Sequence, residues 1–205
     1  MLHYETIIPE THSLLEKLSA LPVLEDARLV GGTALALQLG HRTSVDLDFF
    51  GRINADSEEL RDVLREVGKV EVASVSKNIN IFWINGIKVD MVNYPYPWLD
   101  MPIEENGVRL ASLKDIAAMK VSAIVNRGTK KDFIDLYTLL QSFTLDDILD
   151  MYSRKYSDGS LFIVMKSLTY FDDAETDPMP NVLNDTTWKI AKDSIRTVVR
   201  NSSIL

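Results

Sequence analysis

Residues 31–50 read GGTALALQLGHRTSVDLDFF. The glycine pair follows a short strand pattern at residues 28–30 and precedes a run typical of a helix over about residues 33–39. Glycines at a strand-to-helix turn let backbone N–H groups approach a phosphate, and the helix N-terminus adds a favourable dipole. The stretch therefore predicts a phosphate-binding turn, although two adjacent glycines also occur in ordinary turns.

Asp46 and Asp48 are the second feature of this stretch. Residues 44–50 alternate apolar and acidic positions, which predicts a strand with both carboxylates on one face and the apolar residues, Val45 among them, on the other. Two like charges this close raise each other's pKa, so the pair is most readily kept where a cation lies between them. Carboxylate oxygens together with substrate phosphates suit Mg²⁺. A solvated strand face is the alternative interpretation.

Asp90 is the candidate third carboxylate. An Asn-Gly pair joins IFWI to IKVDMV within residues 81–92, which favours a two-residue type I′ hairpin with Asp90 opposite Ile81. A charge inside so apolar a strand is costly unless it is paired or metal-bound. Three carboxylates on neighbouring strands can hold two metal ions about 3.5–4 Å apart. A pair between Asp90 and Lys88 is the alternative.

Composition narrows the class of protein. The 205 residues contain no cysteine and three histidines, which argues against disulfides, thiolate metal sites and a histidine-rich zinc site. No apolar run approaches the roughly 18 residues of a membrane span, and the N-terminus lacks a signal-peptide pattern, so we expect a cytoplasmic protein. The net charge of −8 gives no overall attraction to nucleic acid. RNA would need a local basic patch, and basic residues gather between Lys120 and Lys131.

The proline-rich stretch 93–102 is expected to be a loop, and the main domain boundary is placed just after it, dividing the chain into 1–110 and 111–205. Helices are predicted over residues 112–127 and 130–141, joined at Gly128, and the remainder is expected to be helical.

Two further helices are predicted over residues 11–20 and 56–67. Thr11 would cap the first, and Asp56 with Glu59 has the spacing of a capping box for the second.

The helical half carries a second group of charged residues. Lys120 lies in an apolar run, which indicates that it faces inward, and Arg127 follows seven positions later on nearly the same helix face. Asp132 and Asp135 share a face of the next helix. Thr129 and Asp132 also have capping-box spacing, so Asp132 could serve only as a cap.

Together these residues resemble the AbiEii/AbiGii toxin-like nucleotidyltransferases, a family within the nucleotidyltransferase fold related to DNA polymerase β. That family has a Gly-Gly-Thr-Ala-Leu start, an Arg-x-Ser-x-Asp-Leu-Asp-Phe strand, and Lys, Arg and Lys/Arg-Asp-x-x-Asp-Leu in its helical half. The resemblance covers about residues 28–140. The matching positions outside the glycine stretch are Arg42, Ser44, Asp46, Leu47, Asp48, Phe49, Lys120, Arg127, Lys131, Asp132, Asp135 and Leu136.

The resemblance implies an α/β (α+β) nucleotidyltransferase fold, with a mixed β-sheet and a helical C-terminal part. It implies transfer of a nucleoside monophosphate from a nucleoside triphosphate to an acceptor hydroxyl, with two Mg²⁺ ions on Asp46, Asp48 and Asp90. The implied catalytic residues are Asp46, Asp48, Asp90, Lys120 and Asp132. The implied nucleotide-binding residues are Gly31, Gly32, Thr33, Arg42, Ser44, Lys120 and Arg127.

The resemblance also implies partners. It implies that the protein is the toxin of a toxin–antitoxin or phage-defence pair. The implied partners are tRNA or another RNA as acceptor and a cognate antitoxin protein. Two alternatives share the fold: an enzyme that nucleotidylates protein hydroxyls, and a non-catalytic nucleotide-binding module.

Overall fold

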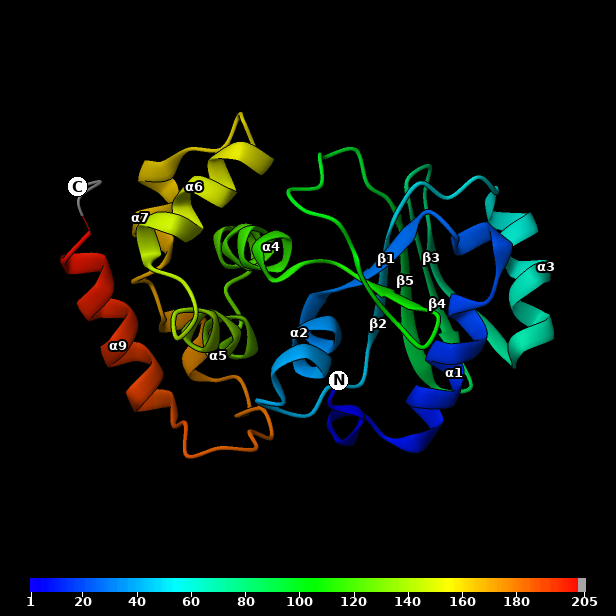
Figure 1. The fold of residues 1–205 in the computed structure, drawn as a ribbon, viewed down its shortest axis with the longest axis horizontal. Coiled ribbons are helices and arrows are strands. Elements are labelled where there is room, and N and C mark those ends of the chain that lie inside the picture. Colours follow the sequence, from blue (N-terminus) through cyan, green and yellow to red (C-terminus); the bar gives the residue numbers. More distant parts are fainter. Residues whose placement is uncertain (203–205) are drawn as a thin grey trace. The chain divides into compact units, whose positions relative to one another are not determined.

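A computed structural model describes residues 1–202, and the chain divides into two compact units. Unit 1 comprises Met1–Pro95 and Pro102–Ala111. Unit 2 comprises Tyr96–Met101 and the chain from Ser112 onward. The short segment 96–101 therefore belongs to the helical unit, although in the sequence it falls between two strands of unit 1 (Figure 1).

Unit 1 is built on a seven-stranded sheet with the order β3-β4-β5-β2-β1-β7-β6. The β2–β5 and β1–β7 pairs are parallel, and the other neighbours are antiparallel. The predicted mixed sheet is thus confirmed. The strands are β1 (Ala27–Val30), β2 (Leu47–Gly51), β3 (Val70–Val75), β4 (Ile79–Ile84), β5 (Ile87–Asn93), β6 (Ile103–Glu105) and β7 (Val108–Leu110).

The hairpin β4–β5 forms as its sequence predicts. Asn85 and Gly86 both have positive φ, 52° and 80°, as a type I′ turn requires. The register pairs Ile84 with Ile87 and Ile81 with Asp90. This register fixes which residues of β4 lie on the same face of the sheet as Asp90.

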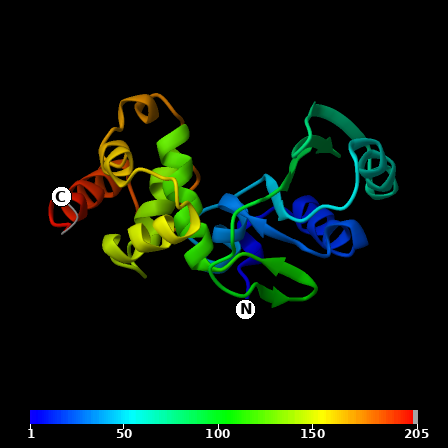
Figure 2. The same cartoon turned by 90° about the horizontal axis from the view of Figure 1, so that it is seen from above.

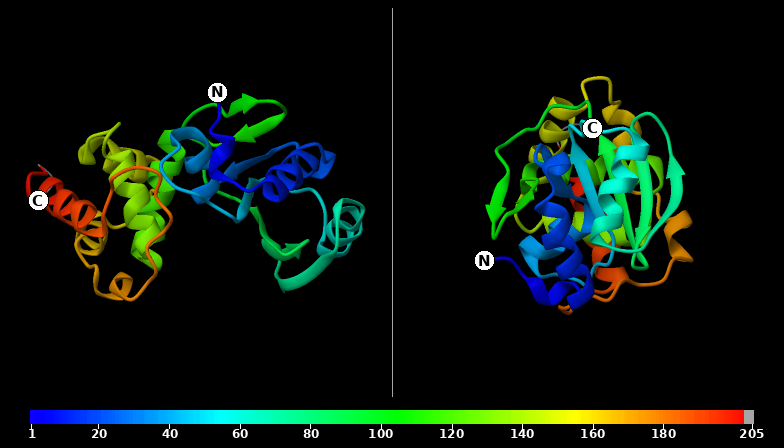
Figure 3. Two further views of the ribbon diagram at one scale, coloured as in Figure 1. Left: turned by 90° about the horizontal axis from the view of Figure 1, so that it is seen from below. Right: turned by 90° about the vertical axis from the view of Figure 1, so that its right-hand side faces the viewer.

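Helices cover one face of this sheet. They include α1 (Pro9–Ser19) and α3 (Ser57–Val67), which contact each other and the strands (Figure 3, right). α2 (Gly31–Leu39) continues directly from β1 and ends at Gly40, whose φ of 64° is the left-handed conformation of a helix C-cap. Unit 1 also contains the short 3₁₀ helices η1 (Tyr4–Thr6) and η2 (Pro22–Leu24).

The two predicted helix caps of unit 1 had different outcomes. Asp56 and Glu59 form the predicted capping box of α3. The prediction that Thr11 caps α1 was wrong. The helix begins at Pro9, with Ile8 as N-cap, and Thr11 is buried inside the first turn. Proline favours the first helical position because its fixed φ suits the helix and its missing N–H needs no partner there.

Three strands were not predicted from the sequence. β3 has no buried residue, and its sequence VEVASV alternates apolar and polar positions only over Val70, Glu71 and Val72, which is too short a pattern to indicate a strand. β6 and β7 are three residues each, too short for periodicity to indicate a strand. They form a hairpin at the β7 side of the sheet, drawn in green in Figure 2.

Unit 2 is helical, and α4 (Leu113–Asn126) contacts α5, α6 and α7. Its other helices are α5 (Lys130–Leu139), α6 (Leu145–Lys155), α7 (Leu161–Ser167), α8 (Asp172–Glu175) and α9 (Trp188–Arg200). Rings of Phe133, Phe171 and Trp188 pack together between α5 and the C-terminal helices, with centroids 4.8–5.8 Å apart. Within residues 1–202, no helix has the length and apolar content needed to cross a membrane.

Candidate functional site

Asp48 and Asp90 lie side by side on the two central parallel strands. The register pairs Asp48 of β2 with Asp90 of β5, and it pairs the buried Leu47 with the buried Val89. Because successive side chains of a strand alternate between faces, the two carboxylates share the face opposite to this core. Val45 was predicted on the core face but is 58% exposed, since β2 begins only at Leu47.

Gly31 makes room for the Asp48 carboxylate. It is the first residue of α2 and has a φ of +70°, a conformation that residues with a side chain rarely adopt. A β-carbon added to Gly31 would overlap Asp48 Oδ2. The carboxylate therefore lies against the backbone of the strand-to-helix turn, as the order of the two motifs suggests.

The other residues of the glycine motif position the chain that leads into β2. The buried Thr33 hydroxyl donates to the backbone carbonyl of Asp46 and lies 2.8 Å from Ser44 Oγ. The guanidinium of the buried Arg42 packs where a β-carbon on Gly32 would lie. These contacts order the segment that carries Asp46, and phosphate binding by these residues stays a prediction.

Asp90 is bound to Lys88, its neighbour on the same face of β5. Lys88 Nζ donates to both carboxylate oxygens at 2.6 and 2.7 Å. Within the described part of the chain, no three His, Asp or Glu side chains are gathered closely enough to hold a metal ion. The donor chemistry of Asp46 and Asp48 fits Mg²⁺, whereas Asp90 has an internal cation as its partner here.

A second cluster lies in unit 2 around Lys120, which faces inward as its apolar neighbours predict. Lys120 Nζ lies 3.1 Å from Asp132 Oδ1 and 2.6 Å from Asp135 Oδ2. All three side chains are buried. One ammonium thus joins two carboxylates of α5 to the middle of α4.

Asp132 is the most heavily bonded member of this cluster. Arg127 donates to it through Nε at 3.0 Å and Nη2 at 3.2 Å, and the Thr129 hydroxyl donates at 2.6 Å. Burial alone would raise the pKa of Asp132, but the Lys120 charge and the bonds from Arg127 and Thr129 hold that pKa well below its usual range. The predicted Thr129–Asp132 capping box was wrong, because the Thr129 side chain bonds to this carboxylate and caps no backbone N–H of α5.

The segment between Lys120 and Lys131 does not present the basic patch that its composition suggests. Lys120 is buried in the cluster just described. Lys130 is buried as well, and its amine donates to the carbonyls of Glu175 and Asp177. Arg127, whose side chain is 57% exposed, and Lys131 are the basic residues of the segment that reach the surface.

Sequence reasoning missed a buried ion pair in unit 2. Lys155 and Asp115 have no exposed side-chain surface and meet at 2.7 Å. The Lys155 amine also donates to the Pro97 carbonyl and lies 4.5 Å from the centre of the Trp98 ring, while Asp115 accepts the N–H of Leu99. Asp115 could be recognised in the sequence only as a helix-capping residue, because its partner lies 40 positions away.

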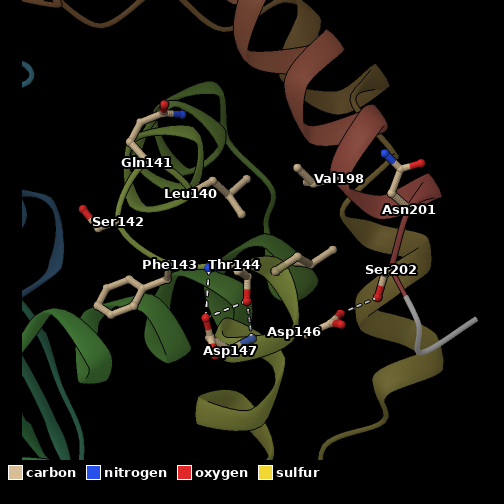
Figure 4. Close-up of a pocket in the computed structure, with 11 residues that line it drawn as sticks. Leu140, Gln141, Ser142, Phe143, Thr144, Asp146, Asp147, Val198, Asn201 and Ser202 are labelled. Atoms are coloured by element: carbon tan, nitrogen blue, oxygen red, sulfur yellow. Dashed lines mark hydrogen bonds between the residues drawn. The ribbon is translucent and has the colours of Figure 1, made fainter.

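A groove of about 540 Å³ in unit 2 is poorly suited to a triphosphate. It lies between the end of α5, the start of α6 and the end of α9 (Figure 4). Among the described residues that line it there is no lysine, arginine or histidine. Two aspartates are present instead: Asp147 pairs with Thr144 in a capping box, and Asp146 accepts from Ser202.

The predicted site residues thus fall into two clusters, one in each unit. The cluster of unit 1 comprises Gly31, Gly32, Thr33, Arg42, Ser44, Asp46, Asp48 and Asp90. The cluster of unit 2 comprises Lys120, Arg127 and Asp132.

A family model and a curated relative both match most of this chain. The family model described as "Nucleotidyl transferase AbiEii toxin, Type IV TA system" matches residues 13–200. An uncharacterized protein of Aquifex aeolicus (strain VF5) is 39% identical over 171 residues, which cover 80% of this chain and 83% of the relative.

Solved structures share the fold at low sequence identity. JHP933 from Helicobacter pylori has a TM-score of 0.59 at 18% identity, over 93% of this chain and 87% of that one. MenT4, a nucleotidyltransferase toxin from Mycobacterium tuberculosis H37Rv, has a TM-score of 0.55 at 16% identity, over 96% and 87%. The antibiotic-resistance factor ANT(2'')-Ia has a TM-score of 0.52 at 16% identity, over 71% and 91%.

Proposed function

Because the chain belongs to the AbiEii family of nucleotidyltransferase toxins, we propose that it transfers a nucleoside monophosphate from a nucleoside triphosphate to a hydroxyl group of an RNA, tRNA included, as the toxin of a toxin–antitoxin pair. The observation that supports this most directly is the pairing of Asp48 with Asp90 on neighbouring strands. The Asp48 carboxylate also lies against Gly31, where any side chain would displace it. Two carboxylates on one sheet face, next to a helix N-terminus, suit the binding of a triphosphate together with a cation.

In the proposed reaction the acceptor oxygen attacks the α-phosphorus. A bond forms between that oxygen and the α-phosphorus, the bond from the α-phosphorus to the bridging oxygen breaks, and pyrophosphate leaves. Asp90 accepts the proton of the attacking hydroxyl, or it completes the metal site with Asp46 and Asp48. Lys88 now donates to both carboxylate oxygens of Asp90, so Asp90 could accept a proton only after at least one of these hydrogen bonds breaks.

Asp46, Asp48 and Asp90 are the proposed ligands of two Mg²⁺ ions. Bound there, such ions would neutralise charge on the phosphates and on the leaving group. The Thr33 hydroxyl, which also bonds to Ser44, donates to the backbone carbonyl of Asp46 and so orders the chain just before β2. Gly31 and Gly32 would offer backbone N–H groups to the triphosphate.

Lys120, Arg127 and Asp132 are proposed to bind or support the triphosphate. Arg127 is the member with an exposed side chain, so it is suited to direct contact with phosphate. Asp132 orients that guanidinium through two hydrogen bonds. Lys120 would add positive charge to the site, and it also balances the two buried aspartates.

The test is transfer of label from each of the four nucleoside triphosphates, radiolabelled at the α-phosphate, to purified total RNA and to total protein, with and without Mg²⁺. Wild-type protein should label RNA only when Mg²⁺ is present. Label on protein instead would identify a protein-modifying enzyme. Nucleotide binding without transfer to either would indicate a non-catalytic module.

Asp48→Asn and Asp46→Asn should abolish transfer, because each removes one proposed ligand of the metal ions. Asp62→Asn is the matched control, since Asp62 is an exposed acid of α3 in the same unit. It should transfer nucleotide like the wild type. Activity of either site variant within about tenfold of wild type, a barrier change of only about 1.4 kcal/mol, would contradict the metal assignment.

A further inference from the structure

The sheet face that carries Asp48 and Asp90 continues across β4 towards the β3 edge. In one row of the register, Asp48 is followed by Asp90, Ile81 and Ser74. In the adjacent row, Lys88 is followed by Trp83 and then by Glu71. The strand alternation puts Ile79 on the same face, next to Ile81.

Ile79, Ile81 and Trp83 form an apolar strip on this face. Trp83 is 42% exposed and Ile79 is 46% exposed, while Phe82 and Ile84, which point to the opposite face, are fully buried. Large apolar side chains on a monomer surface are common singly, but a contiguous group beside polar residues is typical of a binding surface. The position beside the proposed active-site carboxylates indicates which ligand this surface serves.

We propose that this strip is a stacking surface for the terminal base of a single-stranded RNA acceptor, an inference that rests on the proposed transfer to RNA. Exposed aromatic side chains bind unpaired bases through their faces, and every base offers such a face. Diagonal neighbours on adjacent strands lie about 7–8 Å apart, which is the relation between Trp83 and Asp90. A terminal base on Trp83 would thus leave its own ribose hydroxyls near the carboxylates.

Lysine side chains border the strip. Lys69 and Lys77 flank β3 and are exposed, and Lys88 lies directly across from Trp83. Lys69 pairs with Glu71, and Lys88 pairs with Asp90. These lysines reach the surface. Lys120 and Lys130, which belong to the segment that composition suggested as an RNA-binding patch, are buried.

The test compares Trp83→Ala and Trp83→Phe with wild-type protein, using a short single-stranded RNA oligonucleotide with a free 3′-hydroxyl as acceptor. Phe162→Ala is the matched control, because Phe162 is 78% exposed and belongs to unit 2. Trp83→Ala should raise the KM for RNA roughly 5- to 100-fold, as expected when one base loses its aromatic partner. Its kcat and its KM for the nucleoside triphosphate should stay near wild type. Trp83→Phe should restore most of the RNA affinity, and Phe162→Ala should change nothing.

An unchanged KM for RNA in Trp83→Ala would overturn the proposal. An equal rise in the KM for the triphosphate would also overturn it, by placing Trp83 in the nucleotide site. Binding of the same oligonucleotide, followed by quenching of tryptophan fluorescence in wild type and in Trp83→Phe, separates this proposal from the proposed function. Quenching that disappears in Trp83→Phe supports the stacking surface even if no transfer to RNA occurs. Equal quenching in both proteins, or no RNA binding at all, refutes it.

Discussion

Replacing Lys120 with methionine tests both the architecture of unit 2 and the assignment of Lys120 to the active site. Methionine keeps most of the buried stem and removes the charge that lies 3.1 Å from Asp132 and 2.6 Å from Asp135. Removing one partner of a buried ion pair costs about 3–5 kcal/mol, because the remaining charge stays buried without its counter-ion. We expect Lys120→Met to lose about that much free energy of unfolding, a large fraction of the 5–15 kcal/mol typical of a domain.

Urea unfolding at neutral pH measures this loss, and two further variants calibrate it. Lys189→Met removes an exposed lysine that pairs with Asp193 one helical turn away, and it should change the free energy of unfolding by less than about 1 kcal/mol. Lys120→Met combined with Asp135→Asn should recover much of the loss, because the excess negative charge is reduced. A change below about 1 kcal/mol in Lys120→Met would refute the reasoning from the buried cluster.

Single-turnover transfer on the same preparation tests the catalytic role. If Lys120 neutralises charge on the triphosphate, the rate per folded molecule should fall on the order of 10²-fold, as for the loss of one preorganised charge stabiliser. A destabilised variant with a normal rate per folded molecule would remove Lys120 from the active site and leave it a structural role.

Three other perturbations have definite expected outcomes. Gly31→Ala should abolish transfer and lower the melting temperature, because the added methyl overlaps the Asp48 carboxylate and the left-handed φ costs about 1–2 kcal/mol; full activity in a transfer assay would contradict this. Because the folded-state pKa of Asp132 is depressed, its contribution to stability is present at neutral pH and is lost as the pH falls below about 4 towards that folded pKa. Urea unfolding across this acid range should show the loss, and Asp132→Asn should flatten the profile. Lys155→Met should lower the free energy of unfolding by about 3–5 kcal/mol, since it leaves the buried Asp115 without its ammonium; a thermal melt like that of the wild type would show that the pair is dispensable.

Local sequence signals predicted the central part of the fold. The Asn85-Gly86 turn fixed the register of β4 and β5, because only a few two-residue turns match the twist of a hairpin. The capping box of Asp56 and Glu59 marked the start of α3, because it depends on hydrogen bonds between residues three positions apart. The resemblance drawn from the motifs around residues 31–50 and in the helical half is confirmed by the family match over residues 13–200.

Features that depend on distant partners escaped prediction. Lys130 lies in the segment where the sequence suggested a basic patch, but its amine is bonded to carbonyls about 45 positions later in the chain. The Thr129 cap failed because the Thr129 hydroxyl donates to the Asp132 carboxylate, which Lys120 and Arg127 hold in the buried cluster. β3 was missed because it is an exposed edge strand whose apolar and polar residues alternate only over Val70, Glu71 and Val72. In each case the deciding interaction is tertiary, and local spacing carries no information about it.

The segment Tyr96–Met101 determines how this protein can be recombined with a relative. The polypeptide passes from one unit to the other after Pro95, again after Met101, and a third time after Ala111. A chimera that exchanges only the helices from residue 112 onward would separate Asp115 and Lys155 from the loop that they bind. A chimera that also takes residues 96–101 from the same donor would carry the whole network into its new host, so a functional graft of this helical part requires three crossover points.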